Sequence, residues 1–334
     1  ITHPEKQYKN LKELILEPRR RLRNWLNLKK LTILPGSSLS LGDSKQFQRS
    51  DLSNPYHDFI ESNYGSKVVT ASIHINLGID DLSTIFSALR LVRCESALFL
   101  SLSASSPFLD GVSTGAHSQR WLQFPKTPKQ VPLFVDHTHY VNWIEDQLQS
   151  GIMRNERHLW TSVRPNGDRR PYELNRLELR ICDLITDCDL LLAITALLEL
   201  RVLTLINNPD LFDPVKISKL TLKELAELCD MNEEEAAKRS LDAKLHHWID
   251  GQVISCRDWI AQLFEEVKPL AIDLDLLSLL EPIQQVLENG NQSMKWINAY
   301  SNGQSIPIIL QNSIKSMKAE EDQLKKNILN PDCL

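Results

Sequence analysis

Apolar and polar side chains alternate along three short segments, which is the pattern of half-buried β-strands. Residues 69–77 place Val, Ala, Ile, Ile and Leu on one side and Thr, Ser, His and Asn on the other. Residues 159–164 place Trp, Ser and Arg on one face. Residues 176–183 place Leu177, Leu179 and Ile181 on one side and Arg176, Glu178, Arg180 and Cys182 on the other. The pattern predicts a sheet with one apolar face and one face that carries His, Glu and Arg.

Apolar residues at helical spacing predict helices that cover the apolar face. The expected helices span residues 11–26, 85–102, 139–148 and 190–206. Pro18 should start, kink or divide the first helix, and Asp80 or Asp81 is expected to cap the second. Charged residues interrupt both long apolar runs, 85–102 and 190–206, so core helices explain them better than membrane spans.

The pattern of the sequence changes near residue 210. Before it, residues 31–34 resemble a strand, and the Pro- and Gly-rich segment 35–64 is expected to be a long ordered loop that covers a site. After it, only amphipathic helical segments follow, over residues 222–228, 233–249, 257–268, 274–287 and 309–328. We therefore predict a catalytic domain over residues 1–210 and a helical C-terminal subdomain over residues 211–334.

Composition narrows the class of protein. A chain of 334 residues with 42% hydrophobic and 24% charged residues is typical of a globular fold, and a net charge of −5 argues against a nucleic-acid binder. Six cysteines without a C-x-x-C pair indicate neither a zinc ribbon nor a disulfide framework. We expect a cytoplasmic protein without membrane or nucleic-acid partners, and the oligomeric state is not indicated. Because the first residue is Ile1, we also expect a processed chain or a piece of a longer product.

The polar face combines one imidazole, one carboxylate and several guanidinium groups. One interpretation is a structural ion-pair network around Glu178. The other is a ligand site, in which His74 and Glu178 bind a hard divalent cation while Arg164 and Arg180 neutralise phosphate oxygens. No P-loop or dinucleotide-binding glycine motif occurs, so a nucleotide would need another architecture. The adjacent arginines at 169–170 are equally consistent with a solvated basic turn.

Five ordered strings carry a resemblance to a known family. They read SIHINLG (72–78), LSASSPFLDG (102–111), TGAHSQR (114–120), VRPNGD (163–168) and LELRICD (177–183). Together they resemble the glutamate-cysteine ligase type 2 family, especially its cyanobacterial group. The resemblance implies an α+β, glutamine-synthetase-like domain, in which a curved, mainly antiparallel sheet has helices on one face.

The resemblance also implies a reaction. In this family ATP phosphorylates the γ-carboxylate of L-glutamate, and the amine of L-cysteine attacks the acyl phosphate, which is the first step of glutathione synthesis. Magnesium and ATP are the implied cofactors. His74 and Glu178 match metal ligands, and Arg180 and Arg164 match catalytic and phosphate-binding positions. Arg120 matches a further position that contacts phosphate or a substrate carboxylate.

One departure from the family pattern leaves other functions open. The family begins with a strand that carries paired glutamates of the E-x-E type, followed by another metal-binding Glu, and this sequence starts downstream of both. We therefore expect an N-terminally truncated ligase. The alternatives are a ligase of the same fold with another amine acceptor, and an inactive protein that keeps the fold for binding or assembly.

Overall fold

Three short antiparallel strands in the order β1–β5–β4 form the sheet that carries the polar candidate residues. These strands span Ile75–Gly78, Arg176–Leu179 and Val163–Asn166. The computed structural model describes residues 2–46, 51, 53–64, 69–123 and 127–329. Leu77, Leu177 and Leu179 face the interior, where helix α3 packs on β4 and β5. The predicted α+β class, with a mainly antiparallel sheet and helices on one face, is confirmed.

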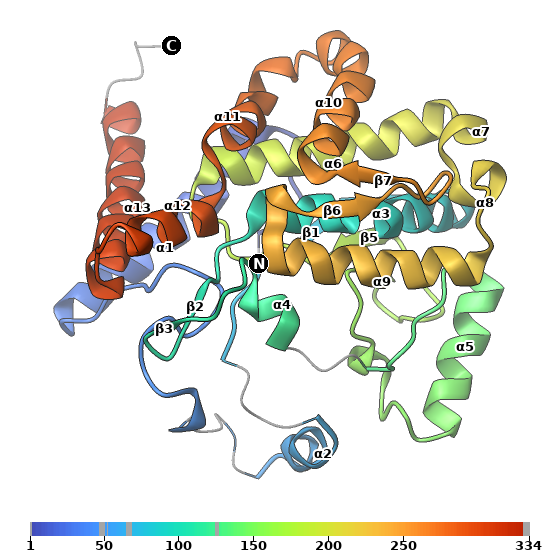
Figure 1. Cartoon of the computed structure of the whole chain (residues 1–334), viewed down its shortest axis with the longest axis horizontal. Coiled ribbons are helices and arrows are strands. Elements are labelled where there is room, and N and C mark those ends of the chain that lie inside the picture. The colour runs from blue at the N-terminus through green and yellow to red at the C-terminus, as the bar shows by residue number, and fades with distance from the viewer. Residues whose placement is uncertain (1, 47–50, 52, 65–68, 124–126, 330–334) are drawn as a thin grey trace.

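Helices make up most of the described chain (Figure 1). In the first part they are α1 (Tyr8–Leu28), α2 (Pro55–Tyr64), α3 (Leu82–Ser103), α4 (Gln119–Gln123), α5 (His137–Gln149) and α6 (Cys188–Asn207). In the second part they are α7 (Pro209–Phe212), α8 (Pro214–Ile217), α9 (Leu222–Arg239), α10 (Cys256–Asp273), α11 (Glu281–Asn289), α12 (Gln292–Ser301) and α13 (Ile306–Leu329). Two small hairpins join β2 (Phe108–Leu109) to β3 (Val112–Ser113) and β6 (Lys244–His246) to β7 (Val253–Ser255).

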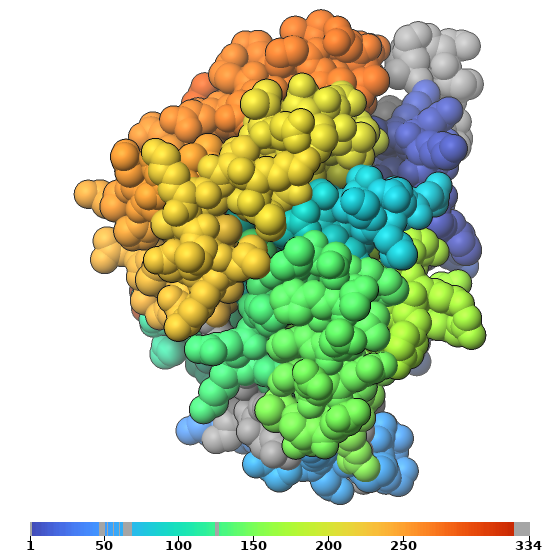
Figure 2. Space-filling view, turned by 90° about the vertical axis from the view of Figure 1, so that its right-hand side faces the viewer, coloured from blue at the N-terminus to red at the C-terminus, as the bar shows by residue number. Residues whose placement is uncertain are grey.

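Helix α3 is the central element of the core. Its N-cap is Asp81, one of the two predicted caps, whose side chain accepts a hydrogen bond from the backbone N–H of Thr84. Nearly every residue from Ile85 to Ser103 is buried, because α6 and α9 pack on α3 as well as the sheet. Figure 2 shows the start of α3, in cyan, reaching the surface between α5 in green and the yellow α7–α9 region.

Helices α1 and α13 pack side by side at the left of Figure 1. Arg23 of α1 is buried and donates two hydrogen bonds to Glu321 of α13, at 2.6 and 3.0 Å. Four arginines lie at positions 19–21 and 23 of α1, and Arg23 among them forms an interhelical ion pair. Among the residues that the structure describes, no helix is long and apolar enough to cross a membrane.

Three predicted elements were wrong. Residues 31–34 form no strand. The first β-bridge in the described part of the chain is at Ser38, which pairs with Thr70. The predicted loop 35–64 contains α2. The predicted helix 233–249 ends at Arg239, because Ser240 takes a positive φ of 44° and the following residues turn into the β6–β7 hairpin.

One hydrophobic core extends across residue 210. The largest buried cluster runs from Ile75 in β1 to Val286 in α11, and it includes residues of α3, α6, α9 and α10. The predicted division into residues 1–210 and 211–334 stays a prediction. Both parts contribute to the same packed interior.

Candidate active site

The register of the sheet places Glu178 between two polar neighbours. Arg164 of β4 pairs with Glu178 of β5 on one side, and Asn76 of β1 pairs with it on the other. The rows before and after this one are apolar and face α3. Alternation thus carries Glu178 and Arg164 to the face opposite α3, as predicted from the sequence.

The Glu178 carboxylate accepts hydrogen bonds from three side chains. His74 lies just before β1, and its Nδ1 is 2.9 Å from Oε1. Arg164 Nε is 2.6 Å and Asn166 Nδ2 is 3.0 Å from Oε2. Burial alone would raise the pKa of Glu178, but the hydrogen bond from His74 and the charge of Arg164 lower it to about 2. The carboxylate is therefore ionised and acts only as an acceptor.

Arg180 also lies near the Glu178 carboxylate, but its position depends on an irregularity in the strand after Leu179. Ser72 pairs with Asp183, and Ile75 pairs with Leu179. Ser72 lies three positions before Ile75, whereas Asp183 lies four positions after Leu179, so the segment after Leu179 contains one extra residue. Such a bulge redirects side chains. The Arg180 guanidinium lies over the Trp160 ring, at 5.4 Å from its centroid, and its Nε is 3.9 Å from Glu178 Oε1.

The bulge also explains why the Cys182 side chain does not lie on the predicted side of the sheet. Cys182 was expected on the polar face with Glu178 and Arg180. Instead it is fully buried, and its Sγ contacts the backbone oxygen of Phe99 in α3 at 3.9 Å. The alternation holds through Leu179 and fails where the extra residue enters.

Positive charge exceeds negative charge around Glu178. Arg164, Arg170 and Arg180 interact electrostatically with one another, and the carboxylates near them are Glu178 and, beside Arg170, Glu156. Burial and the neighbouring Arg164 lower the pKa of Arg180 to about 9, and the same causes lower the pKa of Arg170. At neutral pH the guanidinium groups are still cationic, so the cluster favours a bound anion.

Arg120 lies behind this cluster, in a separate buried ion pair. Its side chain is 1% exposed, and Nε donates to Asp183 Oδ1 at 2.7 Å while Nη2 donates to the backbone oxygen of Ile181. Asp183 also accepts hydrogen bonds from the hydroxyls of Ser106 and Ser118. This environment favours a structural role for Arg120, and its predicted contact with phosphate or substrate stays a prediction.

Sequence reasoning missed three residues of this cluster. Asn166 shares a face with Arg164, so knowledge of the β4–β5 register would have found it. Arg170 was visible only as part of a basic turn; its Nη2 donates to the backbone oxygen of Glu156 at 2.9 Å, so it points inward. Tyr140 of α5 is buried, and its hydroxyl interacts electrostatically with Arg170 and Glu178. It carried no signal in the sequence, because buried tyrosines on helices are common in cores.

The described residues supply few ligands for a magnesium ion. No group of three or more His, Cys, Asp or Glu side chains within them can hold a metal. Both oxygens of Glu178 accept hydrogen bonds from neighbouring side chains. Because Mg²⁺ prefers six oxygen ligands, His74 and Glu178 would supply only part of its coordination, and their role as metal ligands stays a prediction.

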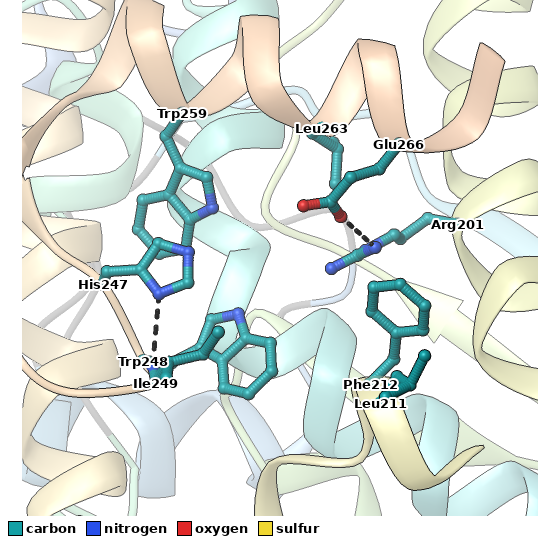
Figure 3. Close-up of a pocket in the computed structure, with 9 residues that line it drawn as sticks. All are labelled: Arg201, Leu211, Phe212, His247, Trp248, Ile249, Trp259, Leu263 and Glu266. Carbon is teal, nitrogen blue, oxygen red and sulfur yellow. Dashed lines mark hydrogen bonds and ion pairs between the residues drawn. The ribbon is translucent and has the colours of Figure 1, made fainter. Parts of the chain in front are cut away.

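A small cavity of about 30 Å³ lies elsewhere, between α6, α7, α10 and the residues around the β6–β7 hairpin (Figure 3). Arg201 pairs with Glu266 at its edge, at 2.7 Å, and with the buried Glu95 behind it. None of the candidate residues lines this cavity. Since the Arg201 charge is already matched by two carboxylates, we assign the cavity to packing around an ion pair.

The family of the chain follows from a comparison with known proteins. The profile of glutamate-cysteine ligase family 2 (GCS2) matches residues 1–321. The chain belongs to this family. The resemblance carried by the five sequence strings is therefore confirmed, and the Glu178 cluster is the candidate active site of a family 2 chain.

Curated relatives are about 25% identical to this family 2 chain over the residues that align. Proteins named "Putative glutamate--cysteine ligase 2" from Solibacter usitatus and Sorangium cellulosum are each 25% identical to it, over 231 and 248 residues. These matches cover 68% and 73% of the chain but only 57% and 62% of the relatives. The chain thus spans less than two thirds of the length of the relatives it matches.

A solved structure supports the fold. The glutamate–cysteine ligase of Francisella tularensis, determined in complex with AMP, has a TM-score of 0.65 with this chain. The match covers 90% of this chain and 80% of that protein, at 16% sequence identity. At this identity the likeness shows the shared fold alone.

Proposed function

We propose that the chain is part of an ATP-dependent ligase that joins the γ-carboxylate of L-glutamate to the amine of L-cysteine. ATP phosphorylates the γ-carboxylate, and the amine then displaces phosphate from the γ-glutamyl phosphate. A carboxylate needs this activation because its own oxygen is a poor leaving group. The observation that carries the proposal is the arginine cluster around Glu178 in a chain of glutamate-cysteine ligase family 2.

In this proposal the arginines bind and stabilise negative charge. Arg164 and Arg180 flank the Glu178 carboxylate and act on the transferred phosphoryl group. Trp160 lies against the Arg180 guanidinium and limits its movement. The complex of the Francisella tularensis enzyme with AMP is consistent with a nucleotide as ligand of this fold.

Magnesium enters the proposal only with the nucleotide. Mg²⁺ often binds through one or two carboxylates together with phosphate oxygens and water. Glu178 and His74 would then contribute to an ion that arrives with ATP, while their present partners keep the carboxylate ionised. A cytoplasmic location, with glutamate and cysteine as small-molecule partners, belongs to the same proposal.

The test is phosphate release from ATP by the chain, with MgCl₂, L-glutamate and a panel of amines that includes L-cysteine. Release that requires glutamate and is fastest with cysteine supports the proposal. Release with a different amine supports a ligase of the same fold with another acceptor. A folded chain that releases no phosphate with any amine contradicts both enzyme functions for this chain by itself and favours a binding or assembly role.

A substitution tests the assignment of Glu178. Glu178→Gln keeps the size of the side chain but removes its charge, so ATP-dependent formation of the acyl phosphate should fall at least about a hundredfold, as for the loss of one oriented charged group in an active site. Glu265→Gln is a suitable control, because Glu265 is exposed and, among the described residues, pairs only with Lys268 on α10. Near-normal turnover by Glu178→Gln would contradict the role of this residue.

A further inference from the structure

Three buried hydrogen-bond donors lie beside the candidate active site without partners. They are the Nε atoms of Arg170 and Arg180 and the hydroxyl of Tyr140, and none has a hydrogen-bond partner within the described part of the chain. Buried polar groups are nearly always paired, so three unpaired donors in one place require an explanation. An acceptor-rich ligand would explain all three.

The three donors converge from different elements. Tyr140 belongs to α5, Arg170 to the loop between β4 and β5, and Arg180 to the bulged segment after β5. The Tyr140 hydroxyl interacts electrostatically with Arg170, Arg164 and Glu178. His137, at the start of α5, lies 2.9 Å from the backbone oxygen of Pro171 through its Nε2 and so holds the helix against the loop.

The neighbouring arginine shows that this arrangement is specific to Arg170. The side chain of Arg169 is 76% exposed and pairs with Glu173 four residues later. Arg170 instead turns inward, where Nη1 is 3.4 Å from Asn166 Oδ1 and Nη2 donates to the backbone oxygen of Glu156. Its charge is not matched by a carboxylate contact in the described residues. The basic turn thus contains one solvated arginine and one directed at the site.

We propose that Arg170 and Tyr140 form a subsite for an oxyanion of a substrate, next to Arg164 and Arg180. This inference rests on the proposed function and adds two binding residues to it. The ligand group is a carboxylate or a phosphoryl group, since both offer several acceptor oxygens to guanidinium and hydroxyl donors. A change in the rotamer of Arg170, which is common on ligand binding, would present its donors to the ligand.

Tyr140→Phe is the decisive variant, because a structural role and a binding role predict opposite results. The ring of Tyr140 packs edge-on against Phe134, with centroids 5.0 Å apart, and Phe retains this contact. Removal of a buried hydroxyl without a partner should leave the melting temperature of the free protein unchanged or raised. Binding of the oxyanion should weaken about tenfold or more, the factor expected for one hydrogen bond to a charged group.

The experiment is calorimetric titration of the full chain in MgCl₂ with inorganic pyrophosphate and, separately, with L-glutamate. We compare the wild type with Tyr140→Phe, Arg170→Gln and Arg170→Lys, and use Arg169→Gln as the control with the same charge change. Weakening of pyrophosphate binding identifies the phosphoryl group as the ligand, and weakening of glutamate binding identifies the carboxylate. Arg170→Lys should bind with intermediate affinity, because it keeps the charge but loses the planar fork of donors.

The possible failures are distinct. If the wild type binds a probe and Tyr140→Phe and Arg170→Gln bind it equally well, the subsite is overturned while the proposed function stands. If Tyr140→Phe lowers the melting temperature of the free protein and leaves affinity unchanged, its role is structural. If the folded wild type binds neither probe, both the subsite and the anion site of the proposed function are overturned.

Discussion

At the scale of single residues, the groups around Glu178 all favour its charged form. His74 and Asn166 donate hydrogen bonds to the carboxylate, and Arg164 adds both a hydrogen bond and a full charge. A structural ion pair needs only one of these partners. The convergence of all three, together with two further arginines, is what distinguishes this cluster from an ordinary surface network.

The ionisation of Glu178 should make stability depend on pH. Its pKa in the folded chain is about 2, against an ordinary value of 4.5, so its stabilising effect is fully present above pH 4.5 and is lost as the pH falls toward 2. We expect the free energy of unfolding of the wild type to fall by about 2 kcal/mol more than that of Glu178→Gln over this range. Urea unfolding at several pH values measures the difference.

Parallel pH profiles for the wild type and Glu178→Gln would contradict this assignment. They would mean that the carboxylate is no better stabilised in the folded chain than in the unfolded one. Glu265→Gln serves again as the control, since Glu265 and Lys268 form only a surface ion pair.

Loss of charge at Arg120 and at Arg180 should have different effects on stability and on nucleotide binding. Arg120→Met leaves Asp183 buried without its cation, which should lower the free energy of unfolding by about 3–5 kcal/mol. Arg180→Met removes a guanidinium that is crowded by Arg164, so stability should change by less than about 1 kcal/mol while nucleotide binding weakens. Thermal unfolding with and without ADP separates the two effects. Equal losses of stability would refute the division into a structural and a binding arginine.

At the scale of elements, the periodicity of apolar residues predicted the positions of helices and the facing of strand side chains, which local sequence determines. It placed Glu178 and Arg164 on one face, and it located α3, α5 and α6 within a few residues, because burial of one face selects the side-chain period. It did not locate the extra residue after Leu179, the hairpin after Ser240 or the inward turn of Arg170. Each of these features depends on which distant segments pair in the folded chain, and a single sequence does not contain that pairing in readable form.

The turn between β4 and β5 should tolerate no side chain at Gly167. A Cβ added there would lie 1.9 Å from the backbone oxygen of Glu173 and 2.7 Å from the Cα of Leu174, so backbone would have to move. Gly167→Ala should lower the free energy of unfolding by about 1–3 kcal/mol and weaken anion binding, because the adjacent Asn166 positions Glu178.

Gly78→Ala provides the matched control for this substitution. Gly78 ends β1 in the same sheet, and a Cβ added there meets no atom within 4 Å. Its stability and binding should stay close to those of the wild type. A similar loss in both variants, measured by thermal unfolding and calorimetry, would show that the close contact at Gly167 is not the cause.

At the scale of the whole molecule, one ion network connects elements on both sides of residue 210. Glu95 of α3 is fully buried and accepts hydrogen bonds from Arg201 of α6, at 2.6 and 2.9 Å, and from Trp248 Nε1 at 3.2 Å. Arg201 also pairs with Glu266 of α10. The sheet that carries the candidate site packs on α3. By stabilising α3, this network therefore also stabilises the sheet beneath the site.

Loss of this network should therefore weaken the entire chain. Arg201→Met leaves Glu95 buried without its cation, and we expect the free energy of unfolding to fall by about 3–5 kcal/mol. Because the core is continuous from β1 to α11, tryptophan fluorescence and far-ultraviolet circular dichroism should report one coincident transition at the lower stability. The double variant Glu95→Met/Arg201→Met should recover part of the loss, since it removes both charges. If instead the two probes separate, with only part of the helical signal lost early, residues 1–210 and 211–334 unfold as independent units and the network does not couple them.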